Sequence, residues 1–110
     1  MRSIPVDTSR MVFIAAGSPR PKVKDRQTGE IKYNADGSPM WQLQVLAQVE
    51  DNDAETLLIS FPAAHAITAR LGTPLNVQDL TAIPWETNGR HGVAFAAASI
   101  APMDPRKSVE

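Results

Sequence analysis

The sequence predicts an all-β domain of five strands with one short helix. Residues 41–49 alternate between apolar and polar side chains, which is the period of a strand with one buried face. Two further strand-like runs flank Asn88-Gly89, a pair that favours a two-residue hairpin because both central positions of a type I′ turn need positive φ. A chain of 110 residues has the size of one domain, so we expect residues 1–110 to fold as a single unit.

The first strand is expected at residues 10–16, a stretch rich in Val, Phe and Ile that ends at Gly17-Ser18-Pro19. Residues 1–9 are expected to form an N-terminal arm. Residues 20–39 are polar and carry turn signals at Thr28-Gly29 and Asp36-Gly37, which predicts a long basic loop or a hairpin arm.

The second and third strands are expected to pair as a hairpin. In the second strand the apolar side chains share one face: Trp41, Leu43, Val45, Ala47 and Val49. An acidic turn over residues 50–55 then leads to residues 56–61, in which Leu57, Ile59 and Phe61 share a face. The two strands are therefore predicted to be antiparallel neighbours.

Residues 62–71 predict the short helix. Pro62 suits a first helical turn, several alanines follow it, and Gly72 with Thr73-Pro74 forms a stop. After the helix, the apolar residues Leu75 and Val77 lie at odd-numbered positions of the strand alternation, whereas Leu80 and Ala82 lie at even-numbered positions. This change predicts a bulge near Gln78-Asp79 that bends the fourth strand.

The fifth strand begins at His91 and contains small residues that allow another backbone to approach closely, namely Ala94, Ala96, Ala97 and Ala98. Residues 102–110 are expected to form a flexible tail. The order strand, strand, strand, helix, strand, strand is that of an OB-fold, a five-stranded Greek-key barrel. An SH3-like barrel or a meander sandwich also fits the number of strands.

The composition argues against several kinds of chemistry. The chain has no cysteine, which excludes a thiol nucleophile, a disulfide framework and a cysteine zinc site. His65 and His91 have no second strong ligand at metal-binding spacing, and no phosphate-loop or nucleophile-elbow motif occurs. We therefore expect a protein that is not an enzyme and needs no metal or cofactor. The apolar run Met11–Ala16 is far shorter than the ~20 residues of a membrane span, so we expect a soluble, cytoplasmic protein.

Charges of each sign are clustered, although the net charge is only −1. The basic cluster lies in the 20–39 segment, and the acidic cluster is Glu50, Asp51, Asp53 and Glu55. Proteins that bind single-stranded nucleic acid combine a cationic groove with exposed aromatic rings on which bases stack. The candidate nucleic-acid-binding residues are Arg20, Lys22, Lys24, Arg26, Lys32, Tyr33, Trp41, Trp85 and Arg90.

The aromatic candidates also have structural explanations. Trp41 shares its face with Leu43 and Val45, so core packing explains it at least as well as base stacking. Trp85 lies between Pro84 and Glu86 near a hairpin end, where exposure is expected. Tyr33 has the most polar surroundings of the three.

The segment Gly72-Thr73-Pro74-Leu75-Asn76-Val77 is followed by Pro84-Trp85-Glu86 and then by Gly89-Arg90-His91-Gly92-Val93-Ala94-Phe95. Together these resemble the fourth and fifth strands of single-stranded DNA-binding proteins. The opening Ile4-Pro5-Val6-Asp7-Thr8-Ser9-Arg10-Met11 resembles that of small OB-like proteins encoded with replication and transfer genes on actinobacterial plasmids and integrative elements. The second strand lacks the aromatic and arginine residues of the bacterial housekeeping proteins. The resemblance implies a barrel that coats displaced single strands of a mobile element.

Two hypotheses of function follow. The first is a non-enzymatic protein that binds single-stranded DNA with little sequence preference, in which the arm from Arg20 to Lys32 and the last hairpin hold the strand from two sides. The second is a protein-interaction module that docks a replication or transfer partner without binding DNA. Under either hypothesis, we expect the protein to self-associate into a homodimer or a larger homo-oligomer.

Overall fold

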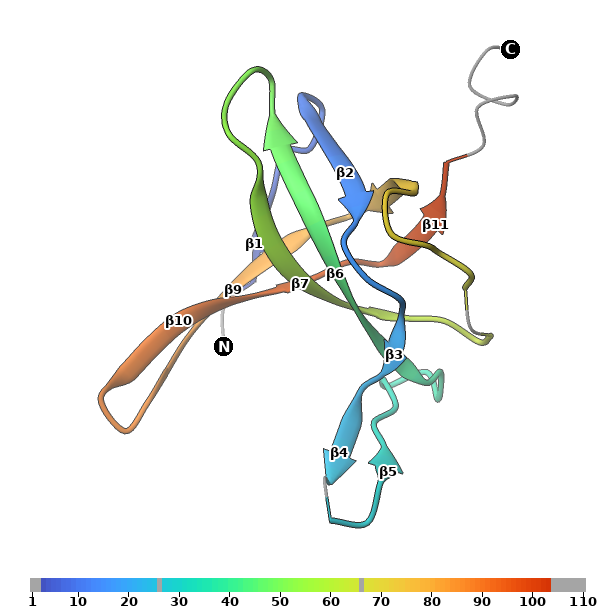
Figure 1. Ribbon diagram of the computed structural model, residues 1–110. Helices are drawn as coiled ribbons and strands as arrows, with labels where there is room; N and C mark the ends of the chain where they lie inside the picture. Colours follow the sequence, from blue (N-terminus) through green and yellow to red (C-terminus); the bar gives the residue numbers. More distant parts are fainter. Residues whose placement is uncertain (1–2, 26, 66, 104–110) are drawn as a thin grey trace.

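The computed structural model describes residues 3–25, 27–65 and 67–103, and these residues form β-strands without a helix (Figure 1). The strands are β1 (Ile4–Pro5), β2 (Met11–Ala15), β3 (Arg20–Pro21), β4 (Val23–Asp25), β5 (Glu30–Ile31), β6 (Met40–Val49), β7 (Glu55–Pro62), β8 (Pro74–Gln78), β9 (Thr81–Thr87), β10 (Arg90–Ala96) and β11 (Ser99–Pro102). The all-β class expected from the sequence is confirmed.

One curled, mixed sheet contains most of the strands. Its order is β1-β9-β10-β7-β6-β2-β8-β11, and β3 pairs with β6 outside this path. The neighbours are antiparallel except β7 and β10, which run parallel. The sheet curls so that β8, which directly precedes β9 in the chain, pairs with β2 on the other side. The strands β4 and β5 form a separate two-stranded ribbon.

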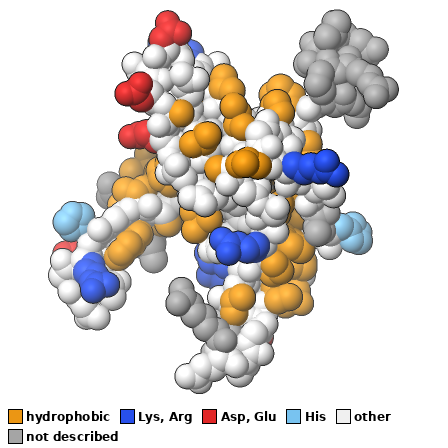
Figure 2. All heavy atoms as spheres, viewed as in Figure 1, with side chains coloured by type: hydrophobic (Ala, Val, Ile, Leu, Met, Phe, Trp, Pro, Cys, Tyr) orange, Lys and Arg blue, Asp and Glu red, His pale blue; other side chains and the backbone are white. Residues whose placement is uncertain are grey.

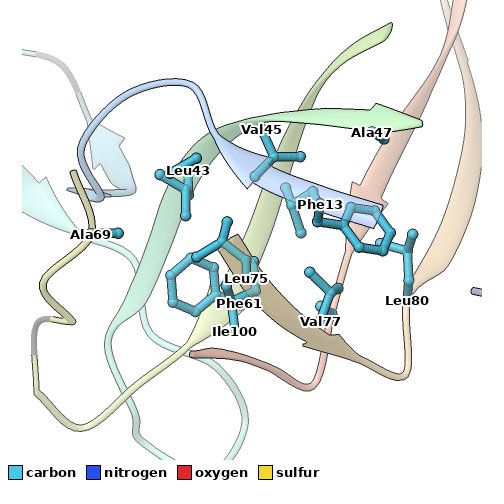
Figure 3. Packing of buried hydrophobic residues seen from close by; sticks show 13 residues of the cluster. Phe13, Leu43, Val45, Ala47, Phe61, Ala69, Leu75, Val77, Leu80 and Ile100 are labelled. Carbon is cyan, nitrogen blue, oxygen red and sulfur yellow. The ribbon is translucent and has the colours of Figure 1, made fainter. Parts of the chain in front are cut away.

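The concave side of the curl encloses the apolar core (Figure 3). Leu43, Val45 and Ala47 of β6 are buried, whereas Gln44, Leu46 and Gln48 between them are exposed, as the alternation predicts. Opposite them lie the fully buried Ile59 and Phe61 of β7. Removing side chains of this size from water contributes about 2 kcal/mol each, so the core stabilises the curl.

Both predicted hairpins are confirmed. β6 and β7 pair antiparallel from Met40 with Pro62 to Ala47 with Glu55. β9 and β10 pair through the two-residue loop Asn88-Gly89, whose φ angles are 52° and 79°. Both angles are positive, as a type I′ turn requires.

The fourth strand, which was predicted to be bent by a bulge near Gln78-Asp79, is interrupted at that position instead. The segment divides into β8 and β9, and Asp79 at the break has a φ of 54°. The break lets β8 pair with β2 while β9 pairs with β10. Leu80, the next residue, turns into the core and is only 2% exposed.

The helix predicted at residues 62–71 is wrong for the part of this segment that is described. Pro62 closes β7 instead of opening a helix, because it pairs with Met40. The following residues bond outward to other parts of the chain: the Ala63 N–H donates to Pro39 O, and the Gly72 N–H donates to Ala15 O. A ten-residue helix has little intrinsic stability, so burial of Ala69 in the core outweighs alanine's helix propensity.

The segments that connect or flank the five predicted strands contain additional short strands. Residues 1–9 include β1, which pairs with Ala82 and Thr81 of β9. Residues 20–39 include β3, β4 and β5, and a bridge between Tyr33 and Pro39. Residues 97–103 include β11, which pairs with β8; of the expected tail, residues 104–110 lie outside the described residues. Within the described ranges, no helix is long and apolar enough to cross a membrane.

Candidate nucleic-acid interface

A row of small and polar residues crosses the convex side of the sheet. Arg20 of β3 lies beside Gln42 of β6, Gln42 beside Ser60 of β7, and Ser60 beside Ala96 of β10. Residues in register on neighbouring strands project from the same face. The row therefore joins the start of the 20–39 segment to the last hairpin strand.

Lys22 reaches over this row. Its Nζ donates a hydrogen bond to Ser60 Oγ at 3.2 Å, and the Lys22 N–H donates to Met40 O. Partial burial, and secondly the nearby charge of Lys32, lower the pKa of Lys22 below the ordinary lysine value. A bound anion would stabilise the charged form of Lys22, because the anion's negative charge offsets both the loss of solvation and the repulsion by Lys32.

A groove of about 350 Å³ lies next to Lys22. We call it the sheet groove, and its lining includes Lys22, Gln42, Leu57, Leu58, Ser60, Trp85, Val93 and Phe95. At one end Lys22 and Gln42 also line a depression beside Arg20. At the other end Trp85 and Val93 also line a depression on the β9–β10 hairpin. The sheet groove thus connects the 20–39 segment with the hairpin.

Trp85 forms the aromatic wall of the sheet groove. It pairs with Gly92 across the β9–β10 hairpin, and 39% of its surface is exposed. The indole lies against the glycine: a Cβ atom at position 92 would lie 2.8 Å from Trp85 Cζ2 and 3.0 Å from Cε2. The ring can occupy this position because residue 92 has no side chain, and the exposed part of the ring is accessible to a ligand.

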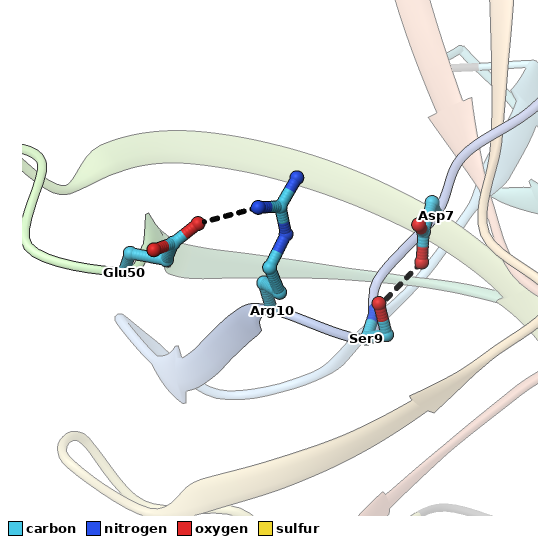
Figure 4. A network of polar contacts seen from close by, with 4 residues as sticks. All are labelled: Asp7, Ser9, Arg10 and Glu50. Atoms are coloured by element: carbon cyan, nitrogen blue, oxygen red, sulfur yellow. Dashed lines mark hydrogen bonds and ion pairs between the residues drawn. The ribbon is translucent and has the colours of Figure 1, made fainter.

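Within the described residues, no ion pair involves Lys22 of the sheet groove or the nearby Arg20 and Lys32. Among the described residues, the one ion pair joins Arg10 Nη1 to Glu50 Oε1 at 2.9 Å, at the far end of the β6–β7 hairpin (Figure 4). Arg20, Lys22 and Lys32 are thus available to phosphate groups. Figure 2 shows Lys and Arg side chains toward the 20–39 arm and the hairpin tip, and Asp and Glu side chains gathered at the β6–β7 turn at the top left.

The remaining predicted residues lie at different distances from this groove. Lys32 is held close to Lys22, because its N–H donates to Lys22 O at 2.8 Å. Tyr33 is 57% exposed and lines a separate depression with Lys32. Arg90 is exposed at the tip of the β9–β10 hairpin.

The last three predicted residues, Lys24, Arg26 and Trp41, are not among the described residues that line the sheet groove. The backbone of Lys24 belongs to β4, and Arg26 lies outside the described residues. Trp41 packs against the core, and its Nε1 donates to Ala63 O at 3.0 Å. Trp41 does not line the sheet groove, so of its two sequence interpretations the structure favours core packing.

Sequence reasoning missed several residues of the groove. Gln42, Leu58 and Ser60 lie in the strands that were predicted correctly, on the faces opposite the core. The same alternation that marks the core could have identified them. Gly92 gave no local signal, because its role depends on Trp85 being its cross-strand neighbour.

No group of three or more His, Asp or Glu side chains able to hold a metal ion occurs in the described part of the chain. Comparison with protein-family models, with curated proteins and with solved structures found no match.

Proposed function

We propose that this chain is a five-stranded OB-type barrel that binds single-stranded DNA in the sheet groove. The five strands would be β2, β6, β7, the bent pair β8–β9, and β10. In OB-folds the face of strands two and three, with the first and last connecting loops, binds oligonucleotides. The sheet groove lies on β6 and β7, between the 20–39 segment and the β9–β10 hairpin, which is the corresponding position.

One observation carries the proposal: Lys22, which forms no ion pair among the described residues, and the partly exposed indole of Trp85 line the same groove. Lys22, with Arg20 and Lys32 close by, would contact phosphates, and Trp85 would stack on a base. Base stacking on an aromatic ring contributes ~1–3 kcal/mol and is tolerant of sequence. Binding should therefore be weakly sequence-specific and should weaken with salt. The resemblance to plasmid-encoded proteins extends the proposal to strands displaced during replication or transfer of a mobile element.

The test separates stacking from phosphate binding. Fluorescein-labelled oligo-dT and an abasic oligomer of equal length are titrated by anisotropy at two salt concentrations. Lys22→Glu should weaken the binding of both oligomers, because both carry the same phosphates. Trp85→Ala should weaken the binding of oligo-dT but leave the abasic oligomer nearly unchanged.

Arg70→Glu is the matched control, because it makes the same charge change at an exposed residue that does not line the sheet groove. If oligo-dT does not bind the native protein at low salt, the proposal is wrong. Equal losses for Lys22→Glu and Arg70→Glu would place DNA elsewhere on the surface.

A further inference from the structure

β7 and β10 open as a wedge next to their short contact. They pair over two residues only, Phe95 with Ile59 and Ala96 with Ser60. Within the described residues, β6 is then the only strand partner of residues 55–58 of β7, and β9 is the only strand partner of residues 90–94 of β10. In Figure 1 the two hairpins point away from each other beyond this contact. Alternate backbone N–H and C=O groups along both free edges are thus unpaired within the sheet.

A second cavity, of about 390 Å³, lies on the core side of this wedge. Leu80 and Phe95 lie at its base, Met11 and Leu57 form walls, and Asp53 and Glu55 stand at its rim. We call it the acid-rimmed cavity. The apolar walls of this cavity would bind an aliphatic side chain, because its insertion removes apolar surface of both the cavity and the side chain from water.

The wall formed by the N-terminal segment is held in place by local hydrogen bonds. The Val6 N–H donates to Leu80 O at 2.9 Å, and the Met11 N–H donates to Thr8 O at 3.0 Å. The Ser9 N–H donates to Asp7 Oδ1 at 2.9 Å (Figure 4), and this bond lowers the pKa of Asp7. The cavity is therefore bounded by ordered chain on this side.

The rim carries negative charge from Asp53 and Glu55. Within the described ranges these two carboxylates form no ion pair, and the nearby Arg10 is paired with Glu50. Carboxylates at this position disfavour a phosphate chain and favour a cation. The ligand class is thus opposite to that of the sheet groove, although the two cavities share Leu57 and Phe95 as walls.

We propose that the acid-rimmed cavity binds an extended segment of a partner protein, which adds as a strand along the free edge of β7. Side chains of an added strand alternate between faces. The residue beside Leu57 would be aliphatic, and the residue two positions away, beside Glu55, would be Lys or Arg. The residue between them would face the convex side, where Thr56 and Lys22 both line the sheet groove, and would be uncharged. The motif is therefore a cation and an aliphatic residue separated by one neutral residue.

Two synthetic peptides of identical composition test this spacing. Acetyl-Thr-Arg-Thr-Leu-Thr-Arg-Thr-amide places its cations on the same face as leucine, and acetyl-Thr-Thr-Arg-Leu-Arg-Thr-Thr-amide places them on the opposite face. Titrations followed by amide NMR shifts should show tighter binding of the first peptide, by about fivefold, the upper range for an exposed ion pair. The largest shifts should fall on residues 55–58 and on Leu80.

Variants of the protein and of the peptide complete the test. Glu55→Lys should abolish the preference between the two peptides, and Asp36→Lys, the same change at an exposed turn outside the cavity, should retain it. Two N-methylated forms of the first peptide are compared, one methylated at the Arg and Leu backbone nitrogens and the other at the Thr backbone nitrogens. Only alternate N–H groups of an added strand bond to its neighbour, so one of the two forms should lose binding.

Several results would overturn the proposal: no binding of the first peptide at its solubility limit, equal binding of both peptides, or tolerance of both methylation patterns. Lys22→Glu should not weaken peptide binding, and Glu55→Lys should not weaken oligo-dT binding. A failure of peptide binding with intact DNA binding would therefore reject this inference alone.

Discussion

The sheet groove and the acid-rimmed cavity are nearly equal in size, about 350 and 390 Å³, and both are walled by Leu57 and Phe95. They differ in the charge that surrounds them. The 20–39 segment brings Lys22 to one, and the β6–β7 turn and the first residue of β7 bring Asp53 and Glu55 to the other. Apolar strand residues therefore provide the binding space here, whereas charged residues in or next to the connecting segments decide which ligand charge is accepted.

The largest effect is expected from removing the shared wall. Phe95→Ala should lower the free energy of unfolding by about 3 kcal/mol, because the ring packs against the core from a partly buried position. Urea unfolding measures this loss. Val93→Ala, a change at a half-exposed neighbour, should alter stability by less than about 0.5 kcal/mol. Similar stabilities for the two variants would mean that Phe95 does not pack against the core as described.

Reversing one charge on each side should separate the two ligands. Lys22→Glu should weaken oligo-dT binding about tenfold and lower the salt dependence, log Kd against log salt, by about 0.7 for one lost phosphate contact. Glu55→Lys should leave oligo-dT affinity unchanged or slightly raise it. If Glu55→Lys strengthened DNA binding as strongly as Lys22→Glu weakened it, DNA would occupy both cavities.

Filling the space under Trp85 tests the aromatic half of the sheet groove. Gly92→Ala places a Cβ atom within 2.8 Å of the indole, so the ring must move. We expect oligo-dT affinity to fall by about 1 kcal/mol, part of one stacking contribution, together with a shift in tryptophan emission. Gly17→Ala is the control, because nothing lies within 4 Å of a Cβ atom there. Unchanged affinity in Gly92→Ala would remove Trp85 from the interface.

The smallest effect is a pH dependence at Lys22. Its pKa is lowered in the folded protein, so the amine loses its proton at a pH where an ordinary lysine is still charged. Oligo-dT affinity should therefore begin to fall at a lower pH than in Lys22→Arg, whose side chain stays charged. The sign for stability is opposite: between the folded and unfolded pKa values the unfolded chain binds more protons, so stability rises with pH. Identical pH profiles for the two proteins would contradict this.

Most of the strands were predictable because their signals are local. The alternation in residues 41–49 requires one buried and one exposed face, and Asn88-Gly89 supplies the two positive φ angles of a tight hairpin. The break at Asp79 was visible as a change of phase. The helix at 62–71 was predicted wrongly because alanine content is local information, whereas the burial of Ala69 and the bonds to Pro39 and Ala15 depend on distant parts of the chain.

The residues of the candidate site also include some that local sequence predicts and some that it does not. Trp85, Arg20 and Lys22 were found from residue type and surroundings, but Trp41 was ambiguous until Phe61 and Ala63 were placed beside it. The partners of the site could not be predicted: Ser60 for Lys22, 38 residues away, and Gly92 for Trp85 across the hairpin.

Local sequence patterns are sufficient for the class of fold, the two hairpins and the separation of basic and acidic segments, because periodicity, turn chemistry and charge depend on consecutive residues. The tertiary structure decided that β7 and β10 meet over two residues and then diverge. That divergence creates two cavities with a common wall and sets opposite charges beside them. It depends on the curl of the whole sheet, which packing of the core fixes and no short stretch of sequence specifies.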